Sequence, residues 1–165
     1  MGKKETKTNA MRLLDTMGIP YEHREYDCRE FTDGSAVADL LGLDHHQVFK
    51  TLVAAGPDGQ HYVFVLPVDE TLDFKKCARA VGAKAVSLIP QKELLPLTGY
   101  VRGGCTAVGM KKSFPTRIHE TAILFDRIYV SAGRIGSQLL LSPEDLACAC
   151  GGEFADLCRD GNSEQ

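Results

Sequence analysis

The chain has 165 residues, with 44% apolar residues, 25% charged residues, no tryptophan and a formal net charge of −3. These values are typical of one globular domain, and they exclude an intrinsically disordered chain, a collagen and a coiled coil. The apolar runs fall well short of the roughly 18–20 residues that cross a bilayer, and no secretory signal opens the sequence, so we expect a cytoplasmic protein without membrane contact. A tight nucleic-acid binder would carry a strong basic excess, so we expect no DNA binding and only a weak, local contact with RNA.

The first third of the chain predicts two short helices separated by an extended segment and a loop. Residues 8–17 carry apolar side chains at helical spacing before a glycine, which predicts an amphipathic helix. Residues 21–27 are expected to be extended. In the polar loop that follows, Phe31 is the single large apolar residue, and an isolated aromatic on a loop needs a pocket or a ligand. Ser35 is then expected to cap a short helix.

The clearest supersecondary unit in the sequence is a β-hairpin. The apolar runs 49–55 and 61–68 are joined by Gly-Pro-Asp-Gly, which is typical of a hairpin loop. A single helical turn that begins at Asp44 precedes this hairpin. Helical periodicity over residues 72–81 predicts a helix after it, and residues 83–88 then predict a further strand.

The second half of the chain predicts short strands separated by glycine-rich turns. A short helix is expected to begin at Pro90, where a proline fits the first helical turn. Strands are expected over residues 116–119, 127–131 and 137–141. Ser142 opens a Ser-Pro-Glu-Asp sequence that is typical of a helix start, which predicts a last helix. The mixture predicts an α+β fold with a mixed, barrel-like sheet surrounded by helices.

No common catalytic motif is present, so the candidate site depends on unusual placements. Lys50 stands at the head of the first hairpin strand on an apolar face, so its ammonium must reach solvent, pair with an acid or meet an anionic ligand. Gly103 and Gly104 lack side chains, which lets backbone N–H groups approach a ligand. Ser131 ends a strand where a hydroxyl can point into a cavity. Each feature also has a plain structural alternative, namely a lysine that extends to solvent, a loop glycine and a tight turn.

The histidines and cysteines form no clear pattern. His45 and His46 lie on a polar turn and are expected to be solvated, so no histidine is assigned a catalytic role. Cys148 and Cys150 lack the two-residue spacer of a zinc knuckle and have only Cys158 nearby, so we expect reduced thiols and no metal site. A thiol-regulated or metal-regulated protein is an alternative interpretation.

Several segments, in order along nearly the whole chain, resemble the YbaK family, the freestanding relatives of the prolyl-tRNA synthetase editing domain. The matching stretches are 7–10, 48–53, 98–104, 109–112 and 128–133. The resemblance implies one editing domain over residues 1–165, loose at about 1–6 and 159–165. It also implies a barrel-like sheet ringed by helices, as the residue patterns do.

The resemblance implies an activity as well. Members of the YbaK family hydrolyse a wrong amino acid from aminoacyl-tRNA. In the branch that this chain resembles most, the amino acid is cysteine on proline-specific tRNA. The resemblance implies no cofactor, and prolyl-tRNA synthetase is the expected partner. Cysteine and proline are so close in size that one binding pocket separates them poorly, which creates the need for a second site. The family's cysteine-specific members are thought to use the thiol of the substrate itself, and a water oriented by the ribose hydroxyl is the alternative.

The resemblance assigns catalytic roles to a lysine and a glycine pair. Lys50 is expected to hold the phosphate or ribose of the 3′-terminal nucleotide. The backbone of Gly103 and Gly104 is expected to donate to the ester carbonyl as an oxyanion site. After Gly104 the family commonly has Ile-Ser-Pro-Leu, whereas this chain has Cys-Thr-Ala-Val. The preferred amino acid therefore stays open between Cys, Ala and another small residue.

The resemblance also assigns substrate-binding positions. Tyr26 and Phe31 are expected to pack or hydrogen bond near the terminal adenosine. Thr51 lies beside the functional lysine, and Ser131 and Gly133 fall on the family's small-residue strand end. A non-catalytic module that docks on a synthetase or binds a nucleotide would keep the same residues without turnover, so it is the main alternative from another class.

Overall fold

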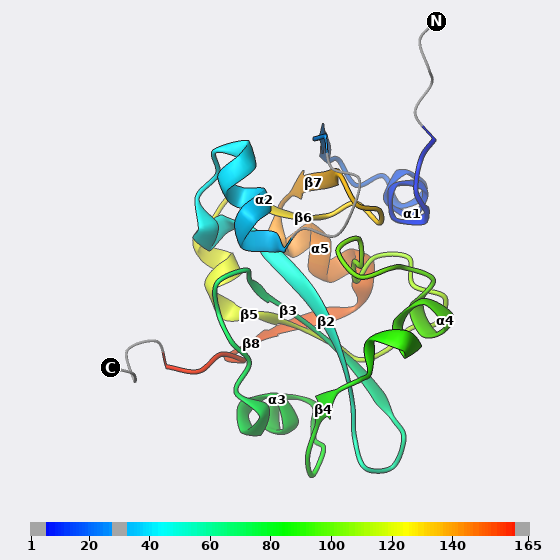
Figure 1. Cartoon of the computed structure of the whole chain (residues 1–165), viewed down its shortest axis with the longest axis vertical. Coiled ribbons are helices and arrows are strands. Elements are labelled where there is room, and N and C mark those ends of the chain that lie inside the picture. Colours follow the sequence, from blue (N-terminus) through cyan, green and yellow to red (C-terminus); the bar gives the residue numbers. More distant parts are fainter. Residues whose placement is uncertain (1–5, 28–32, 161–165) are drawn as a thin grey trace, which may run out of the picture.

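The structure is a computed structural model that describes residues 6–27 and 33–160 (Figure 1). Its helices are α1 (Asn9–Met17), α2 (Gly34–Leu41), α3 (Phe74–Val81), α4 (Leu94–Thr98) and α5 (Pro143–Cys150), with 3-10 turns η1 (His45–Gln47), η2 (Gln91–Glu93) and η3 (Glu120–Leu124). Its strands are β1 (Glu22–Glu25), β2 (Phe49–Ala55), β3 (His61–Pro67), β4 (Ser87–Leu88), β5 (Thr116–His119), β6 (Ile128–Ser131), β7 (Ser137–Leu141) and β8 (Gly152–Ala155). Within the described ranges, no helix is long and apolar enough to cross a membrane.

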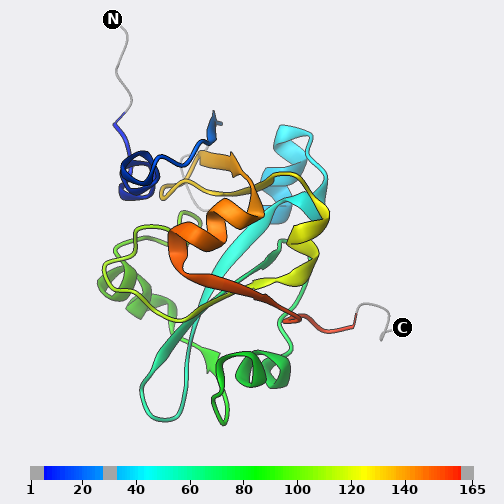
Figure 2. The same ribbon diagram turned by 180° about the vertical axis from the view of Figure 1, so that it is seen from behind.

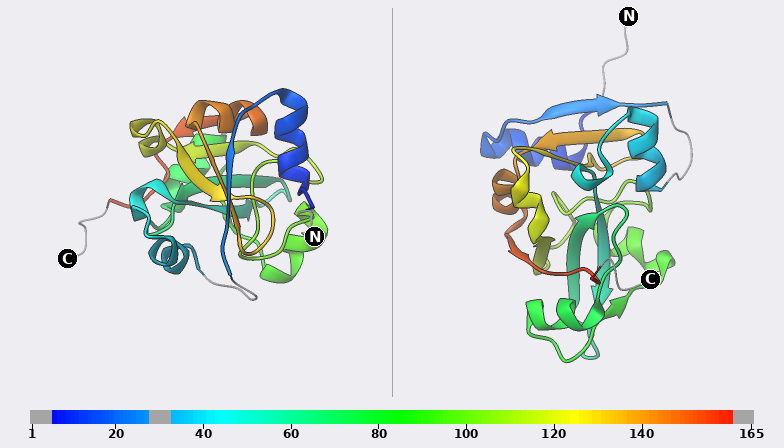
Figure 3. Two further views of the ribbon diagram at one scale, coloured as in Figure 1. Left: turned by 90° about the horizontal axis from the view of Figure 1, so that it is seen from above. Right: turned by 90° about the vertical axis from the view of Figure 1, so that its left-hand side faces the viewer.

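The strands form two sheets. The larger has the order β4-β2-β3-β5-β8, with antiparallel β4–β2 and β2–β3 pairs and parallel β3–β5 and β5–β8 pairs. The smaller is antiparallel in the order β1-β7-β6, and Figure 3 shows β1 and β7 running crosswise to β2 and β3. A parallel bridge between Val48 and Tyr129 links the two sheets. The α+β prediction is confirmed, and the barrel-like arrangement consists, over the described residues, of two open sheets rather than one closed barrel.

The predicted hairpin is confirmed in detail. Strands β2 and β3 pair from Phe49 opposite Pro67 to Ala55 opposite His61, so their whole lengths are in register. The turn closes through a 2.8 Å hydrogen bond from the Gly56 N–H to the Gln60 carbonyl. This long, regular pair holds Lys50 at a fixed place near the start of β2.

The helix starts have the side-chain caps that the sequence predicts, except at α2. The Thr8 side chain accepts from the Met11 N–H at the start of α1, and the Ser142 side chain accepts from the Asp145 N–H at the start of α5. Helix α2, however, is capped by Asp33 and not by Ser35, so the prediction of a Ser35 cap was wrong. The Asp33 carboxylate accepts from the Ala36 N–H at 2.9 Å, which starts the helix two residues earlier.

Two further differences have non-local causes. The strand expected over 83–88 is reduced to β4, because the Ala83 N–H donates to the Ala78 carbonyl and completes the end of α3. Strand β8 was not predicted. Its Gly-Glu-Phe-Ala sequence has no clear alternation, and it exists because it pairs in parallel with β5.

Strand β3 lies at the centre of the core because both of its faces are covered. Val63 and Val65 belong to a cluster with residues of α1 and α5, whereas Phe64 and Leu66 belong to a second cluster with residues of α3. Figure 2 shows α5 in front of the sheet, on the side turned away from the viewer in Figure 1. Burial on both faces explains why β3 is an unbroken apolar run in the sequence.

Candidate active site

A cavity of about 530 Å³ lies where segments far apart in the sequence converge. Its walls come from β2, the start of α2, the segment between β4 and α4, the turn over residues 101–104 (the glycine loop) and the ends of β6 and β7. Of the residues predicted for the site, the structure places Tyr26, Lys50, Thr51, Gly103 and Ser131 on these walls. The cavity thus joins both sheets into one candidate site.

Lys50 supplies the cationic group that β2 brings to the cavity. Its side chain is half-buried, and its Nζ donates to the Val68 carbonyl at 3.0 Å. Burial lowers the pKa of the Lys50 ammonium, and the nearby Asp33 and Asp69 carboxylates partly offset that shift. Within the described residues the Lys50 Nζ donates to one carbonyl, which leaves donors of the ammonium available to solvent or to an anionic or oxygen-rich ligand.

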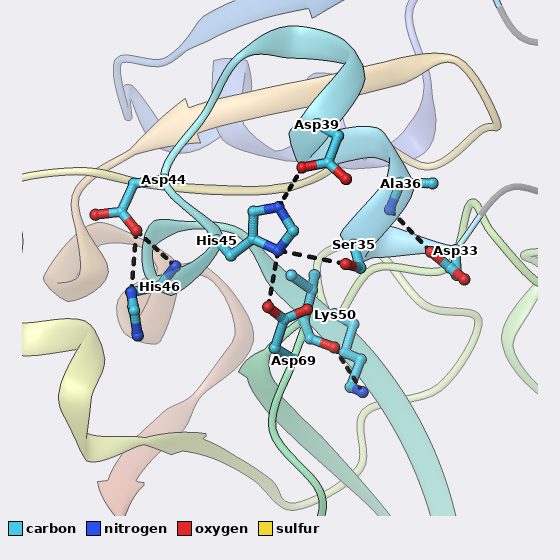
Figure 4. Close-up of polar contacts among 10 residues, drawn as sticks. Asp33, Ser35, Ala36, Asp39, Asp44, His45, His46, Lys50 and Asp69 are labelled. Carbon is cyan, nitrogen blue, oxygen red and sulfur yellow. Dashed lines mark hydrogen bonds and ion pairs between the residues drawn. The ribbon is translucent and has the colours of Figure 1, made fainter.

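A polar cluster behind the cavity connects α2 to the end of the β2–β3 hairpin (Figure 4). The His45 ring contacts Asp39 through Nε2 at 2.7 Å and Asp69 through Nδ1 at 2.8 Å, with Ser35 Oγ 3.3 Å from Nδ1. Carboxylates only accept, so both ring nitrogens donate and the pairs raise the pKa of His45. The prediction of a solvated His45 was wrong, since its side chain is only 25% exposed. His46 is exposed, as predicted.

The glycine loop is shaped by its two glycines in different ways. Gly103 has φ +88° and lines the cavity, and this backbone conformation strains any residue with a Cβ. A Cβ on Gly104 would lie 2.8 Å from the Arg134 Cα, so this position needs glycine for a close approach of two backbones. The Gly104 N–H already donates to the Val101 carbonyl at 2.9 Å. Of the predicted oxyanion pair, Gly103 lines the cavity and Gly104 does not, and the role of their N–H groups stays a prediction.

Ser131 fixes the glycine loop to the end of β6. Its hydroxyl donates to the Gly104 carbonyl at 2.9 Å and accepts from the Gly133 N–H at 3.1 Å. Gly133 itself is not among the residues that line the cavity, and its predicted place beside the substrate stays a prediction. A Cβ there would meet Tyr100 at 3.0 Å and Thr8 at 3.2 Å, which shows that Gly133 serves the packing of β6 against the start of α1.

The remaining predicted positions surround the mouth of the cavity. Tyr26 lines it, and the Tyr26 N–H donates to the Gly136 carbonyl at 2.9 Å, which anchors the end of β1. Thr51 follows Lys50 on β2 and pairs with Val65. Phe31 lies outside the described residues.

The described walls offer binding groups but no activated serine or cysteine. No histidine lines the cavity over the described residues, and the Ser131 hydroxyl is already engaged at both its donor and an acceptor position. Cys105 lines the cavity, but burial raises the pKa of its thiol to about 12, which keeps it neutral. This wall chemistry suits positioning of a substrate that carries its own reactive group.

Comparison with known proteins assigns the chain to a family. The aminoacyl-tRNA editing domain family matches residues 30–148, which include β2, the glycine loop, β6 and β7. The chain belongs to this family. The aminoacyl ester of tRNA is accordingly the substrate class of this editing domain, in agreement with the resemblance seen in the sequence.

Individual relatives cover nearly all of the editing domain. An Enterococcus faecalis protein with the provisional name Cys-tRNA(Pro)/Cys-tRNA(Cys) deacylase EbsC is 42% identical over 160 residues, which are 95% of this chain and 98% of that protein. A crystal structure of a proposed trans-editing enzyme for prolyl-tRNA synthetase is 25% identical, with a TM-score of 0.81 over 94% of this chain and 100% of its own. The crystal structure of hypothetical protein APE2540 has a TM-score of 0.83 at 24% identity, over 92% of this chain and 100% of its own, and supports the fold.

Sequence reasoning missed one polar wall residue of this editing domain. Gln138 is buried in β7 and lines the cavity, and its Oε1 accepts no hydrogen bond from any residue in the described ranges. A signal was present, because a glutamine among the leucines of a buried strand is unusual. Its meaning depends on which neighbours surround it, and the sequence does not give these.

Proposed function

We propose that this chain is a trans-editing deacylase that hydrolyses the ester of mischarged Cys-tRNA(Pro). The observation that carries the proposal is the 42% identity, over 95% of this chain, to a relative whose name gives that substrate. The cavity supports it, because it combines a half-buried ammonium with a glycine loop and has no activated serine or cysteine over the described residues.

Different residues of the cavity bind the terminal nucleotide and the aminoacyl ester of the tRNA. Lys50 holds the phosphate or ribose of the terminal nucleotide, and Tyr26 and Thr51 contact the same nucleotide. The Gly103 N–H donates to the ester carbonyl oxygen, where negative charge develops in the transition state. Ser131 keeps the glycine loop at its place and so acts as a positioning residue.

The bond changes require little from the protein. The substrate thiol attacks its own ester carbonyl, a C–S bond forms, the C–O bond to the ribose breaks and the thiol proton passes to the ribose oxygen. Water then opens the resulting thioester. In the alternative, the neighbouring ribose hydroxyl orients a water that attacks the ester directly. Both routes need a substrate held in a reactive geometry, which is what a preformed cavity provides.

Prolyl-tRNA synthetase is the partner that we propose for delivery of the tRNA. Its active site separates cysteine from proline poorly, since a small apolar difference supplies only roughly 1–3 kcal/mol of discrimination. The structural relative described as a trans-editing enzyme for that synthetase supports this assignment.

The deciding experiment incubates the purified protein with tRNA(Pro) that carries Cys, Ala or Pro and follows the loss of each ester. Selective loss of Cys is expected. Selective loss of Ala would show that the protein is a deacylase whose preferred amino acid is alanine and not cysteine. No loss from any of the three would reject the deacylase and favour the non-catalytic binding module, and release of Pro at the rate of Cys would reject an editing role.

A further inference from the structure

Two basic side chains line the described walls of the cavity, and they differ in exposure. Lys50 is half-buried, whereas Arg102, in the glycine loop, is exposed. The Arg102 Nη1 donates to the Gln91 Oε1 at 3.1 Å, and Gln91 is itself an exposed residue that lines the cavity. The guanidinium therefore lies at the rim of the cavity. Asp33 is the one carboxylate on the described walls, so positive charge predominates there.

The two cations lie on different walls. The Lys50 Nζ donates to the Val68 carbonyl, and Val68 packs against Gly34 at the start of α2. The Arg102 guanidinium is held instead at η2, through Gln91. A ligand that spans the cavity can therefore meet one positive charge that is partly shielded from water and a second that is in contact with it.

The aminoacylated end of a tRNA carries its groups in a matching order. The ester is on the 2′ or 3′ oxygen of the last ribose, and the phosphodiester that continues the chain leaves from the 5′ oxygen. With the ester in the cavity, this phosphodiester must lie at the rim, because the rest of the tRNA remains outside a cavity of about 530 Å³. A phosphodiester carries a full negative charge, and a guanidinium binds its oxygens through two parallel N–H···O bonds.

We propose that Arg102 binds the phosphodiester on the 5′ side of the terminal adenosine. This inference rests on the proposed function, because it takes the aminoacylated end of a tRNA as the occupant. It separates two roles that Lys50 could fill: Arg102 binds the phosphate, and Lys50 binds the ribose and ester oxygens. Arg102 directly precedes Gly103, so the phosphate contact also fixes the loop that carries the proposed ester donor.

The test measures binding of two non-hydrolysable ligands by calorimetry. These are 3′-cysteinylamino-3′-deoxyadenosine with a 5′-methyl phosphate and the same compound with a free 5′-hydroxyl. Wild-type protein is expected to bind the phosphate-bearing ligand about tenfold more tightly, the effect of a charge-assisted hydrogen bond. Arg102→Met is expected to bind the two ligands equally. Lys50→Met should bind both more weakly but keep the preference. Arg79→Met is the matched control, since Arg79 is exposed on α3 and does not line the cavity, and it should also keep the preference.

The outcomes separate this inference from the proposed function. A preference that survives in Arg102→Met, one that disappears in Lys50→Met or Arg79→Met, or equal or absent binding of both ligands by the wild type would each overturn it. Arg102→Met should unfold close to the wild-type midpoint, because the side chain is exposed, and unchanged binding of the 5′-hydroxyl ligand shows an intact cavity. Hydrolysis of Cys-tRNA(Pro) is measured in parallel. A wild type with the phosphate preference but no hydrolysis rejects the deacylase and keeps the role of Arg102, whereas hydrolysis without the preference does the reverse.

Discussion

Lys50 shows how one residue can be costly to the fold and useful to the site. Its ammonium is half-buried, donates to a single carbonyl among the described residues and has its pKa lowered by burial. A base whose pKa is lower in the folded state destabilises that state at neutral pH, and the penalty falls as pH rises through the lowered value. Such a group is retained when a ligand's negative charge compensates it in the bound state.

Replacement of Lys50 by methionine should therefore separate activity from stability. Lys50→Met keeps the methylene packing and should lower kcat/KM for Cys-tRNA(Pro) at least about 100-fold, the size of effect seen when a charge-stabilising donor is removed. The unfolding free energy in urea should change by less than about 1 kcal/mol, because the lost bond to Val68 is offset by the removal of a poorly solvated charge.

Lys76 provides the matched control for this change. Its Nζ is paired with Asp156 at 2.9 Å and Asp160 at 3.1 Å, and it does not line the cavity. Lys76→Met should lower stability while kcat/KM stays near the wild-type value. Near-normal turnover in Lys50→Met would remove Lys50 from the site.

Local chemistry determines which site residues the sequence reveals. Lys50 could be found because an ammonium on an apolar strand face is unusual whatever surrounds it. The surroundings of Gly133 and Gly104 could not be predicted, because one packs against Thr8 and the other has its N–H bound to Val101, and both facts depend on the folded arrangement. Gln138 was missed for the same reason.

At the scale of elements, His45 connects the helix that borders the cavity to the hairpin that carries Lys50. Asp39 belongs to α2 and Asp69 follows β3, and the His45 ring bridges them (Figure 4). The start of α2 lines the cavity, so this bridge helps to hold one wall in place. The His45 ring donates to both carboxylates only while both of its nitrogens carry a proton.

This bridge predicts a pH dependence of stability. The pKa of His45 is raised in the folded protein, so its contribution is complete below the ordinary value near 6.5 and is lost as pH rises through the raised value. The urea unfolding free energy of the wild type should fall over that interval. His45→Gln should lack this fall, whereas His46→Gln should keep it, since the ion pair that His46 makes within the described residues is with Asp44, directly before η1. Identical pH profiles for the wild type and His45→Gln would refute the role of the bridge.

Elements with strong local signals were predicted well. The hairpin was recognised from its two apolar runs and its loop, and α5 from Ser142 and the proline after it. The exit from α3 and the pairing of β8 with β5 are set by contacts between distant segments. The same holds for the two-sheet arrangement, in which, over the described residues, a bridge from Val48 to Tyr129 links two open sheets.

At the scale of the whole molecule, charge and size limit how the protein reads its tRNA. Its 19 basic residues are outnumbered by 22 acidic ones, so little electrostatic attraction to the phosphate backbone is available. The cavity of about 530 Å³ is far smaller than a tRNA, so identity elements elsewhere in the tRNA need a larger surface. The provisional name of the E. faecalis relative includes two cysteinylated tRNAs.

The isolated protein should consequently deacylate Cys-tRNA(Pro) and Cys-tRNA(Cys) with kcat/KM values within about tenfold of each other, and selectivity for the former should rise when prolyl-tRNA synthetase is added. The KM should rise less than about tenfold between 50 and 200 mM salt, because an enzyme with six to ten phosphate contacts would lose about 10³–10⁵ in affinity over that range. Deacylation assays with both tRNAs, with and without the synthetase and at both salt concentrations, measure these effects. A synthetase variant that cannot bind tRNA(Pro) is the control. Sharp discrimination by the isolated protein, or a steep salt dependence, would mean that its own surface reads the tRNA, and the expected dependence on a partner would be wrong.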